Sequence, residues 1–268
     1  MNVGIIGYGS MGQMLLEKFA ESGIIKFKEL FISNRHIEKI HHLTTFYNVC
    51  RSNGELAQKA DIIFICVRPS EIKSVLEEIK PNMKEDALVV SLNGSITFEH
   101  MEKLIDCKIA KAIPSVTAEV NQSQTLVCFN QSVADFDKKE VISILECMGN
   151  VIELPENEMG MGSELVSCMP GFIASIFDVL CQAAKKHTLI PEQQVVQMVL
   201  NTLCATGNLM LENNMTFDEV VSRVATKGGI TEEGVKVISE GFPEIADTIF
   251  LKTLEKRRLT AQKAEELF

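Results

Sequence analysis

The first half of the chain alternates short apolar runs with longer stretches in which apolar residues recur at helical spacing. Such alternation is typical of a parallel β-sheet whose strands are joined by crossover helices. Seven runs are predicted to be strands: Val3–Ile6, Leu30–Ile32, Ile62–Val67, Ala87–Leu92, Lys108–Ile113, Leu126–Phe129 and Val151–Leu154. The pattern therefore predicts an α/β fold with a doubly wound, Rossmann-type sheet over residues 1–155.

After Leu154 the strand pattern stops, and helices are expected over residues 158–186, 191–212, 216–225, 231–240 and 243–266. Pro170 should kink the first helix or open a gap in its hydrogen bonds, and Pro191 suits the first turn of the second. Gly241-Phe242-Pro243 should separate the last two helices. We therefore expect an all-helical domain over residues 156–268. Its helices are apolar on more than one face, so we expect a homodimer or higher homo-oligomer formed through this domain.

A glycine motif joins the first strand to the first helix. Val3–Ile6 runs directly into Gly7-x-Gly9-x-x-Gly12, and apolar residues at helical spacing follow at once. In such motifs the first glycine allows a tight turn, the second admits a pyrophosphate, and the third lets the helix pack on the strand. The free N–H groups of the helix then face the phosphates. The motif predicts a dinucleotide site made of Gly7, Tyr8, Gly9, Ser10, Met11 and Gly12.

The residues after the second strand bear on the choice of cofactor. At the place where NAD-binding proteins carry an acidic residue for the ribose, this chain has Ser33-Asn34-Arg35. A hydroxyl, an amide and a guanidinium suit the 2′-phosphate of NADPH. We therefore predict NADPH in preference to NADH. The alternative is that Ser33 and Asn34 form a turn and Arg35 is an exposed charge.

Three further strand ends are expected beside the cofactor, because α/β sheets bind ligands at the carboxyl ends of their strands. One carries Val67, Arg68 and Pro69, with Ser70 expected as the N-cap of the next helix. The others carry Asn93-Gly94 and Ile113-Pro114-Ser115.

Composition excludes several classes of partner. A net charge of −10 disfavours nucleic acids and anionic membrane surfaces, since both are bound through basic patches. The eight cysteines are scattered singly, and neither they nor His41-His42 have the spacing of metal ligands, which favours reduced thiols and no metal site. Because no leader is recognised and no apolar run is judged to approach membrane-spanning length, we expect a cytoplasmic protein with a small-molecule substrate.

A glycine-rich segment stands out in the helical region: Thr226-Lys227-Gly228-Gly229-Ile230-Thr231. A Gly-Gly pair running into a Thr N-cap makes a second helix N-terminus, whose N–H groups can hold a small carboxylate. Lys227 would add positive charge. The alternative is an ordinary helix connection capped by Thr231.

These motifs resemble those of the pyrroline-5-carboxylate reductase family, in order and spacing, over nearly the whole chain. The matching segments are Gly7-x-Gly9-x-Met11-Gly12, Ser33-Asn34-Arg35, Asn53, Cys66-Val67-Arg68-Pro69, Ile113-Pro114-Ser115 and Gly228-Gly229-x-Thr231. The resemblance implies a Rossmann domain followed by a helical domain that interlocks two subunits, and it adds Asn53 to the cofactor site. It also implies a substrate site formed by Lys227, Gly228, Gly229, Ile230 and Thr231, with Thr231 near the imine nitrogen as the catalytic residue.

The chain departs from the usual family pattern in two places. The typical loop Ser-Pro-Gly-Gly-Thr-Thr is replaced by residues 226–231, and the typical Ser-Gly-Ser-Gly-Pro-Ala-Tyr appears as Val166-Ser167-Cys168-Met169-Pro170-Gly171-Phe172. A ComER-like subgroup, named for a late-competence protein, looks similar at these positions. Ile230 and Met169 make the expected pocket more apolar and more crowded.

The resemblance implies NADPH-dependent reduction of 1-pyrroline-5-carboxylate to L-proline. A strong general acid is not required, because the imine is basic enough to be protonated partly by solvent. Two alternatives stay open. A β-hydroxyacid dehydrogenase shares the layout but needs a base, usually a lysine, and no His, Lys or Arg occurs from Glu140 to Ala184. A ComER-like regulatory protein would bind NADP without turnover.

Overall fold

The computed structural model describes all 268 residues, and its first half contains one eight-stranded sheet in the order β3-β2-β1-β4-β5-β6-β7-β8. Neighbouring strands are parallel except β6 and β7, which are antiparallel. The strands are β1 (Val3–Ile6), β2 (Leu30–Ser33), β3 (Asn48–Val49), β4 (Ile62–Ile65), β5 (Leu88–Ser91), β6 (Lys108–Ile113), β7 (Ser123–Phe129) and β8 (Gly149–Glu153). The predicted α/β class is confirmed, and the sheet is mostly parallel.

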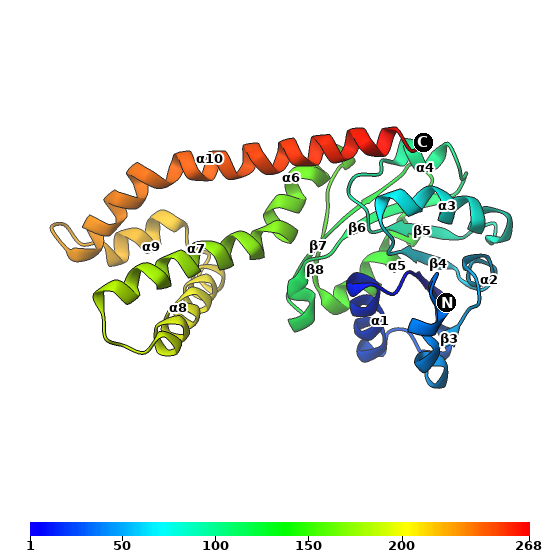
Figure 1. Cartoon of the computed structure of the whole chain (residues 1–268), viewed down its shortest axis with the longest axis horizontal. Coiled ribbons are helices and arrows are strands. Elements are labelled where there is room, and N and C mark those ends of the chain that lie inside the picture. Colours follow the sequence, from blue (N-terminus) through cyan, green and yellow to red (C-terminus); the bar gives the residue numbers. More distant parts are fainter. The chain divides into compact units, whose positions relative to one another are not determined.

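Helices cover both faces of this sheet (Figure 1). On one face, α1 (Ser10–Ser22) and α5 (Asp135–Leu145) contribute side chains to one apolar core. On the other, α2 (Asn53–Lys59), α3 (Pro69–Ile79) and α4 (Phe98–Glu102) contribute to a second core. Strands buried on both faces read as continuous apolar runs, which is why β1, β4 and β5 are visible in the sequence.

Some strand limits differ from the prediction. β3 was not predicted, because two half-buried residues are too few to show alternation. β7 begins at Ser123, earlier than Leu126, because the buried hydroxyls of Ser123 and Thr125 bond to each other at 2.9 Å and so tolerate burial.

The chain forms two compact units, one of residues Met1–Met169 with Leu254–Phe268, and one of Pro170–Thr253. The division predicted between residues 155 and 156 stays a prediction. The remaining helices are α6 (Met159–Ser163), a π-helical turn (Glu164–Cys168), α7 (Met169–Ala184), α8 (Glu192–Glu212), α9 (Phe217–Val224) and α10 (Ile230–Glu265). Short 3₁₀ turns lie at Phe27–Glu29, Ile37–Lys39, His41–Thr45, Lys80–Asn82, Val116–Val120, Glu146–Met148, Glu156–Glu158 and Lys185–His187.

The second unit is all-helical, as predicted, but its prolines act differently from one another. The gap in hydrogen bonding expected at Pro170 is present. The π-helical turn lies directly before α7 and interrupts the regular α-helical bonds there. Pro191 lies one residue before α8, as its N-cap, not inside its first turn. The separation expected at Gly241-Phe242-Pro243 was wrong, because α10 continues through Pro243. Gly241 and Pro243 are exposed, so the carbonyl that Pro243 leaves unpaired can bond to water.

The second unit buries very little apolar surface of its own. Between Pro170 and Thr253 only Cys181 and Val195 are buried hydrophobic residues. Large exposed apolar side chains occur on each of its helices, for example Leu180, Leu200 and Ile245. A unit of this kind needs a further surface to cover these side chains.

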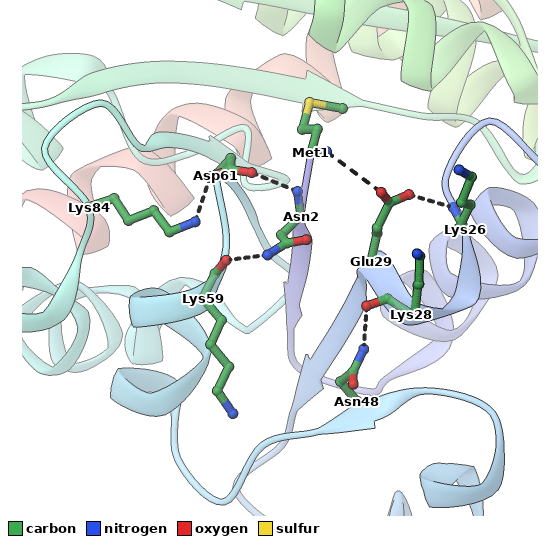
Figure 2. Close-up of polar contacts among 9 residues, drawn as sticks. All are labelled: Met1, Asn2, Lys26, Lys28, Glu29, Asn48, Lys59, Asp61 and Lys84. Atoms are coloured by element: carbon green, nitrogen blue, oxygen red, sulfur yellow. Dashed lines mark hydrogen bonds and ion pairs between the residues drawn. The ribbon is translucent and has the colours of Figure 1, made fainter.

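At the amino ends of the strands a polar network joins β1, β2 and β4 (Figure 2). The Asp61 carboxylate accepts hydrogen bonds from Asn2 N at 2.7 Å and from Lys84 Nζ at 2.6 Å. Asn2 Nδ2 donates to Lys59 O at 2.9 Å, and the Met1 amino group lies 3.8 Å from Glu29 Oε1. Partial burial by itself raises the pKa of Asp61, but the bonds from Asn2 and Lys84 outweigh it, so the pKa of Asp61 is lowered.

Replacing Asp61 by Asn should make the free energy of unfolding fall less steeply as the pH is lowered into the acid range. A carboxyl whose pKa is lower in the folded state stabilises the fold above its unfolded pKa, near 3.9, and loses that contribution as the pH falls through the folded value. The effect at neutral pH should be at most about 1 kcal/mol, because 43% of the Asp61 side chain is exposed and screened by water. Urea unfolding between pH 2.5 and 7 measures it. The control is Glu85→Gln, which removes an exposed carboxylate; equal curves for both variants would contradict the prediction.

Candidate functional site

The three glycines of the first loop differ in their surroundings. Gly7 has a φ of +98°, and a Cβ there would lie 2.7 Å from the Cys66 carbonyl oxygen. A Cβ at Gly12 would overlap the Gly7 carbonyl oxygen. At Gly9 a Cβ would meet nothing within 4 Å. Gly7 and Gly12 are thus required by the fold itself, whereas Gly9 faces open space, where the pyrophosphate is predicted to lie.

The N-terminus of α1 is free to bind an anion. α1 begins at Ser10 with Gly9 as its N-cap, no side chain caps it, and no acidic residue lies in its first turn. The first N–H groups of a helix have no intrahelical acceptor, and they carry the positive end of the helix dipole. This turn can therefore bind phosphate without competition from a local carboxylate.

A cavity of about 460 Å³ lies along the carboxyl ends of β1, β2 and β4. It is lined by eight of the predicted cofactor residues: Gly7, Tyr8, Gly9, Asn34, Arg35, Asn53, Val67 and Arg68. The others do not line it: Ser10, Met11, Gly12, Ser33, Pro69 and Asn93. That these residues bind a cofactor stays a prediction.

Side-chain hydrogen bonds hold the walls of this cavity in place. Asn34 Oδ1 accepts from Tyr8 N at 3.1 Å, which joins the end of β2 to the glycine turn. Ser33 Oγ donates to Asn53 Oδ1 at 2.8 Å, and Asn53 Nδ2 donates to Glu78 Oε2 at 2.6 Å. Ser33 does not line the cavity, but its hydroxyl positions Asn53, which does.

Sequence reasoning missed four charged residues of this cavity: Lys39, Arg51, Glu71 and Glu78. Glu71 matters most for the charge around the predicted cofactor residues, because its Oε1 lies 2.6 Å from Arg35 NH1. Its position could have been inferred from Pro69, since a proline at the first helical position places Glu71 in the first turn.

The expected capping role of Ser70 was wrong. α3 begins at Pro69, Arg68 is its N-cap residue, and Glu71 Oε2 accepts from Arg68 N at 3.3 Å. The missing N–H of Pro69 has no cost at this position, which is why the helix can start at Pro69, two residues earlier than a cap at Ser70 implies.

A buried ion pair lies near the loop that follows β5. Arg257 donates to Glu164 Oε1 from Nε at 3.1 Å and from NH2 at 2.8 Å, and NH2 also donates to Ser163 Oγ at 3.2 Å. Arg257 NH1 would lie 3.5 Å from a Cβ at Gly94. Glu164 is only 1% exposed, and its Oε2 has no hydrogen-bond partner.

This pair fixes the π-helical turn that contains Cys168. Burial raises the pKa of the Cys168 thiol, and the Glu164 carboxylate raises it further. This environment therefore disfavours the thiolate form of Cys168. The ion pair joins residues 93 positions apart, and no local sequence signal predicts it.

The predicted substrate residues form one exposed turn of the second unit. Gly228 has a φ of +75°, and its N–H donates to Glu232 Oε2 at 2.7 Å. Gly229 N donates to Thr226 O at 2.8 Å. The carboxylate of Glu232 shows that this turn offers N–H groups to an acidic oxygen.

Thr231 is not the N-cap of the following helix, contrary to the prediction, because α10 begins at Ile230. Thr231 and Lys227 are exposed, and Ile230 is 95% exposed. The hydroxyl of Thr231 and the first-turn N–H groups are thus available to a ligand. The role of these residues in substrate binding stays a prediction.

The fold and the glycine-turn cavity define a dinucleotide-binding α/β domain joined to a helical domain. Two family profiles match the chain: "NADP oxidoreductase coenzyme F420-dependent" over residues 2–94, and "Pyrroline-5-carboxylate reductase dimerisation" over residues 156–259. These matches identify a nicotinamide dinucleotide as the class of cofactor and show that the helical region is a domain of homo-oligomerisation.

Relatives align over almost the whole chain. Pyrroline-5-carboxylate reductase 3 of Bacillus subtilis is 32% identical over 97% of this chain and 97% of its own length, and ComE operon protein 4 of the same organism is 29% identical over 94% of each. The crystal structure of Plasmodium falciparum pyrroline carboxylate reductase with NADP bound has the same fold, with a TM-score of 0.83 and 24% identity over 100% of this chain and 98% of that one. The chain belongs to the pyrroline-5-carboxylate reductase family.

Alanine at Gly9 and at Gly12 should have different consequences. Gly12→Ala should lower the free energy of unfolding by about 1–3 kcal/mol, because the new methyl group overlaps the Gly7 carbonyl. Gly9→Ala should change it by less than about 0.5 kcal/mol, since its Cβ meets open space, but should weaken NADPH binding about tenfold. Urea unfolding and fluorescence titration of NADPH measure the two effects. Equal losses of stability in both variants would refute the distinction.

Proposed function

We propose that the chain is an NADPH-dependent pyrroline-5-carboxylate reductase, which reduces the cyclic imine 1-pyrroline-5-carboxylate to L-proline. The observation that carries the proposal is the 32% identity with a Bacillus subtilis reductase over 97% of the chain. The helix N-terminus at the glycine turn has no capping side chain and suits a pyrophosphate. The first-turn N–H groups of Ile230 and Thr231 suit a carboxylate, while Gly228 N is already bound by Glu232.

The charge of the cavity supports NADPH as the cofactor. Arg35, Lys39, Arg51 and Arg68 line it, against the two carboxylates of Glu71 and Glu78. Glu78 accepts hydrogen bonds from Asn53 N at 2.9 Å and from Asn53 Nδ2 at 2.6 Å, so its charge is partly offset. The basic groups favour a cofactor with an additional phosphate.

In the proposed reaction the protein binds and orients the imine. The reduced nicotinamide supplies a hydride to C5 of the imine. The first-turn N–H groups at Ile230 and Thr231 hold the substrate carboxylate, Lys227 offsets its charge, and the Thr231 hydroxyl donates one hydrogen bond to the carboxylate or to the nitrogen. Solvent provides the proton on the nitrogen, so no acidic side chain is needed.

The residues at the start of the helical domain disfavour alcohol oxidation. A β-hydroxyacid dehydrogenase needs a base at the start of its helical domain, and no His, Lys or Arg occurs from Glu140 to Ala184. The only buried carboxylate of the π-helical turn, Glu164, is bound to Arg257. A reduction that takes its proton from water fits this environment better.

A homodimer formed through the second unit explains its exposed apolar side chains. One sequence expectation was wrong here: the helical stretch Glu156–His187 is long and apolar enough to cross a membrane. One such stretch is weak evidence of a membrane protein, and the family match assigns residues 156–259 to a dimerisation domain. We propose that a second copy covers this stretch in a cytoplasmic protein.

The proposed activity is tested by mixing the protein with NADPH and 1-pyrroline-5-carboxylate and following the absorbance of the reduced nicotinamide. Turnover is expected. Thr231→Ala should raise KM for the imine at least several-fold and leave KM for NADPH unchanged, because the hydroxyl contacts only the imine acid. The control is Thr248→Ala, the same change further along α10. Tight NADPH binding without turnover would refute the reductase and favour the regulatory alternative.

A charge in the apolar face of the second unit should separate the copies. The wild-type protein is expected to have about twice the chain mass of 29.8 kDa or more in light scattering. Leu200→Asp should shift it toward the monomer, because an interface cannot bury an unpaired carboxylate without a large cost. Phe136→Asp, at an exposed apolar residue of α5, should leave the mass unchanged. A monomeric wild type at micromolar concentration would contradict the proposal.

A further inference from the structure

Arg35, the predicted ligand of the 2′-phosphate, is bound to a carboxylate within the protein. Its NH1 donates to Glu71 Oε1 at 2.6 Å. The other oxygen of Glu71 accepts from Arg68 N at 3.3 Å, which fixes the carboxylate in the first turn of α3. The guanidinium of Arg35 therefore has a fixed internal acceptor, contributed by the neighbouring wall of the cavity.

The other charged groups of the cavity are arranged differently. The side chains of Lys39, Arg51 and Arg68 make no ion pair, and the carboxylate of Glu78 is bonded to Asn53. Among the lysines and arginines of this cavity, Arg35 is thus the single one that is paired with a carboxylate; His36 Nδ1 lies 3.2 Å from Glu38 Oε1. Any ligand that uses Arg35 must share it with Glu71.

The two cofactors differ in how they meet this pair. A 2′-phosphate carries about −1.5 to −2 charges at pH 7 and competes with Glu71 for the same guanidinium, while Glu71 repels it. An unphosphorylated ribose has instead a hydroxyl that can donate to a carboxylate, which is how NAD sites commonly hold it. The pair therefore weakens NADPH binding and strengthens NADH binding.

We infer that Glu71 is a specificity-determining residue, which competes with the 2′-phosphate for Arg35 and so allows the cavity to use NADH as well as NADPH. The inference rests on the proposed NADPH-dependent function of this cavity. The pair is exposed, with 74% of the Arg35 side chain and 31% of the Glu71 side chain accessible, so the effect is moderate.

The decisive variant is Glu71→Gln. Its amide oxygen can still accept from Arg68 N, so the start of α3 is kept, but the negative charge is removed. The dissociation constants of NADPH and NADH are measured by fluorescence of the reduced nicotinamide, without the imine. We expect the constant for NADPH to fall about threefold and that for NADH to rise about threefold, which shifts their ratio about tenfold toward NADPH.

Two further variants test the cause. Glu77→Gln removes the same charge from an exposed position of α3 that makes no ion pair, and it should leave the ratio unchanged. In an Arg35→Gln background, Glu71→Gln should tighten NADPH binding less than it does in the wild type, because only the direct repulsion of the phosphate by Glu71 remains to be removed.

The inference is overturned if Glu71→Gln changes both constants equally, changes the ratio no more than Glu77→Gln, or acts equally in the Arg35→Gln background. If Glu71→Gln lowers the thermal stability, Glu71→Asp takes its place, since it keeps a carboxylate in the first turn but shortens its reach to Arg35. Because binding is measured without the imine, a protein that fails to reduce the imine but shows the shifted ratio refutes the proposed function alone.

Discussion

The cavity beside the glycine turn depends on the close approach of the Gly7 carbonyl to Gly12. No side chain fits at Gly12, and a Cβ at Gly7 would lie 2.7 Å from the Cys66 carbonyl oxygen. The turn therefore brings the start of α1 against both β1 and the end of β4. This contact leaves the first N–H groups of α1 uncapped at the edge of the sheet where three strands end. The hydrogen bond from Tyr8 N to Asn34 Oδ1 joins the same turn to the end of β2.

Side-chain hydrogen bonds also hold the walls that the turn positions. Ser33 bonds to Asn53, Asn53 bonds to Glu78 of α3, and Asn34 accepts from Tyr8 N of the turn. A cavity lined by basic groups would repel its own walls without carboxylates nearby, so Glu71 and Glu78 have a structural reason to be there. Glu78 satisfies the N-terminal N–H groups of α2, and Glu71 satisfies one of α3. The same carboxylates that cap these helices thereby set the electrostatic field in which a phosphate would bind.

How much the sequence predicts depends on whether the determining contacts are local. The fully buried strands β1, β4 and β5 and the glycine turn were predictable, because their patterns are complete within a few residues. Ser70 and Thr231 were misassigned as N-caps because each lies inside its helix, which begins at the residue before it, a proline and an isoleucine. Gly241 and Pro243 looked like a boundary, but an exposed helix can lose one backbone bond to water and continue. The pairs Arg35–Glu71 and Arg257–Glu164 join residues 36 and 93 positions apart, so only the fold could reveal them.

The association of the second unit with another copy could also be predicted from the sequence only in part. Its apolar periodicity predicts helices, and the structure contains them, yet only Cys181 and Val195 are buried hydrophobic residues between Pro170 and Thr253. Helices gain most of their stability from packing an apolar face, so these helices cannot be stable on their own contacts alone. The family match over residues 156–259 supplies the missing surface as a second copy of the domain. Folding of this unit is then linked to association, and its stability depends on protein concentration. The turn at Gly228 and Gly229 lies in this unit, so its stability is linked to the same association.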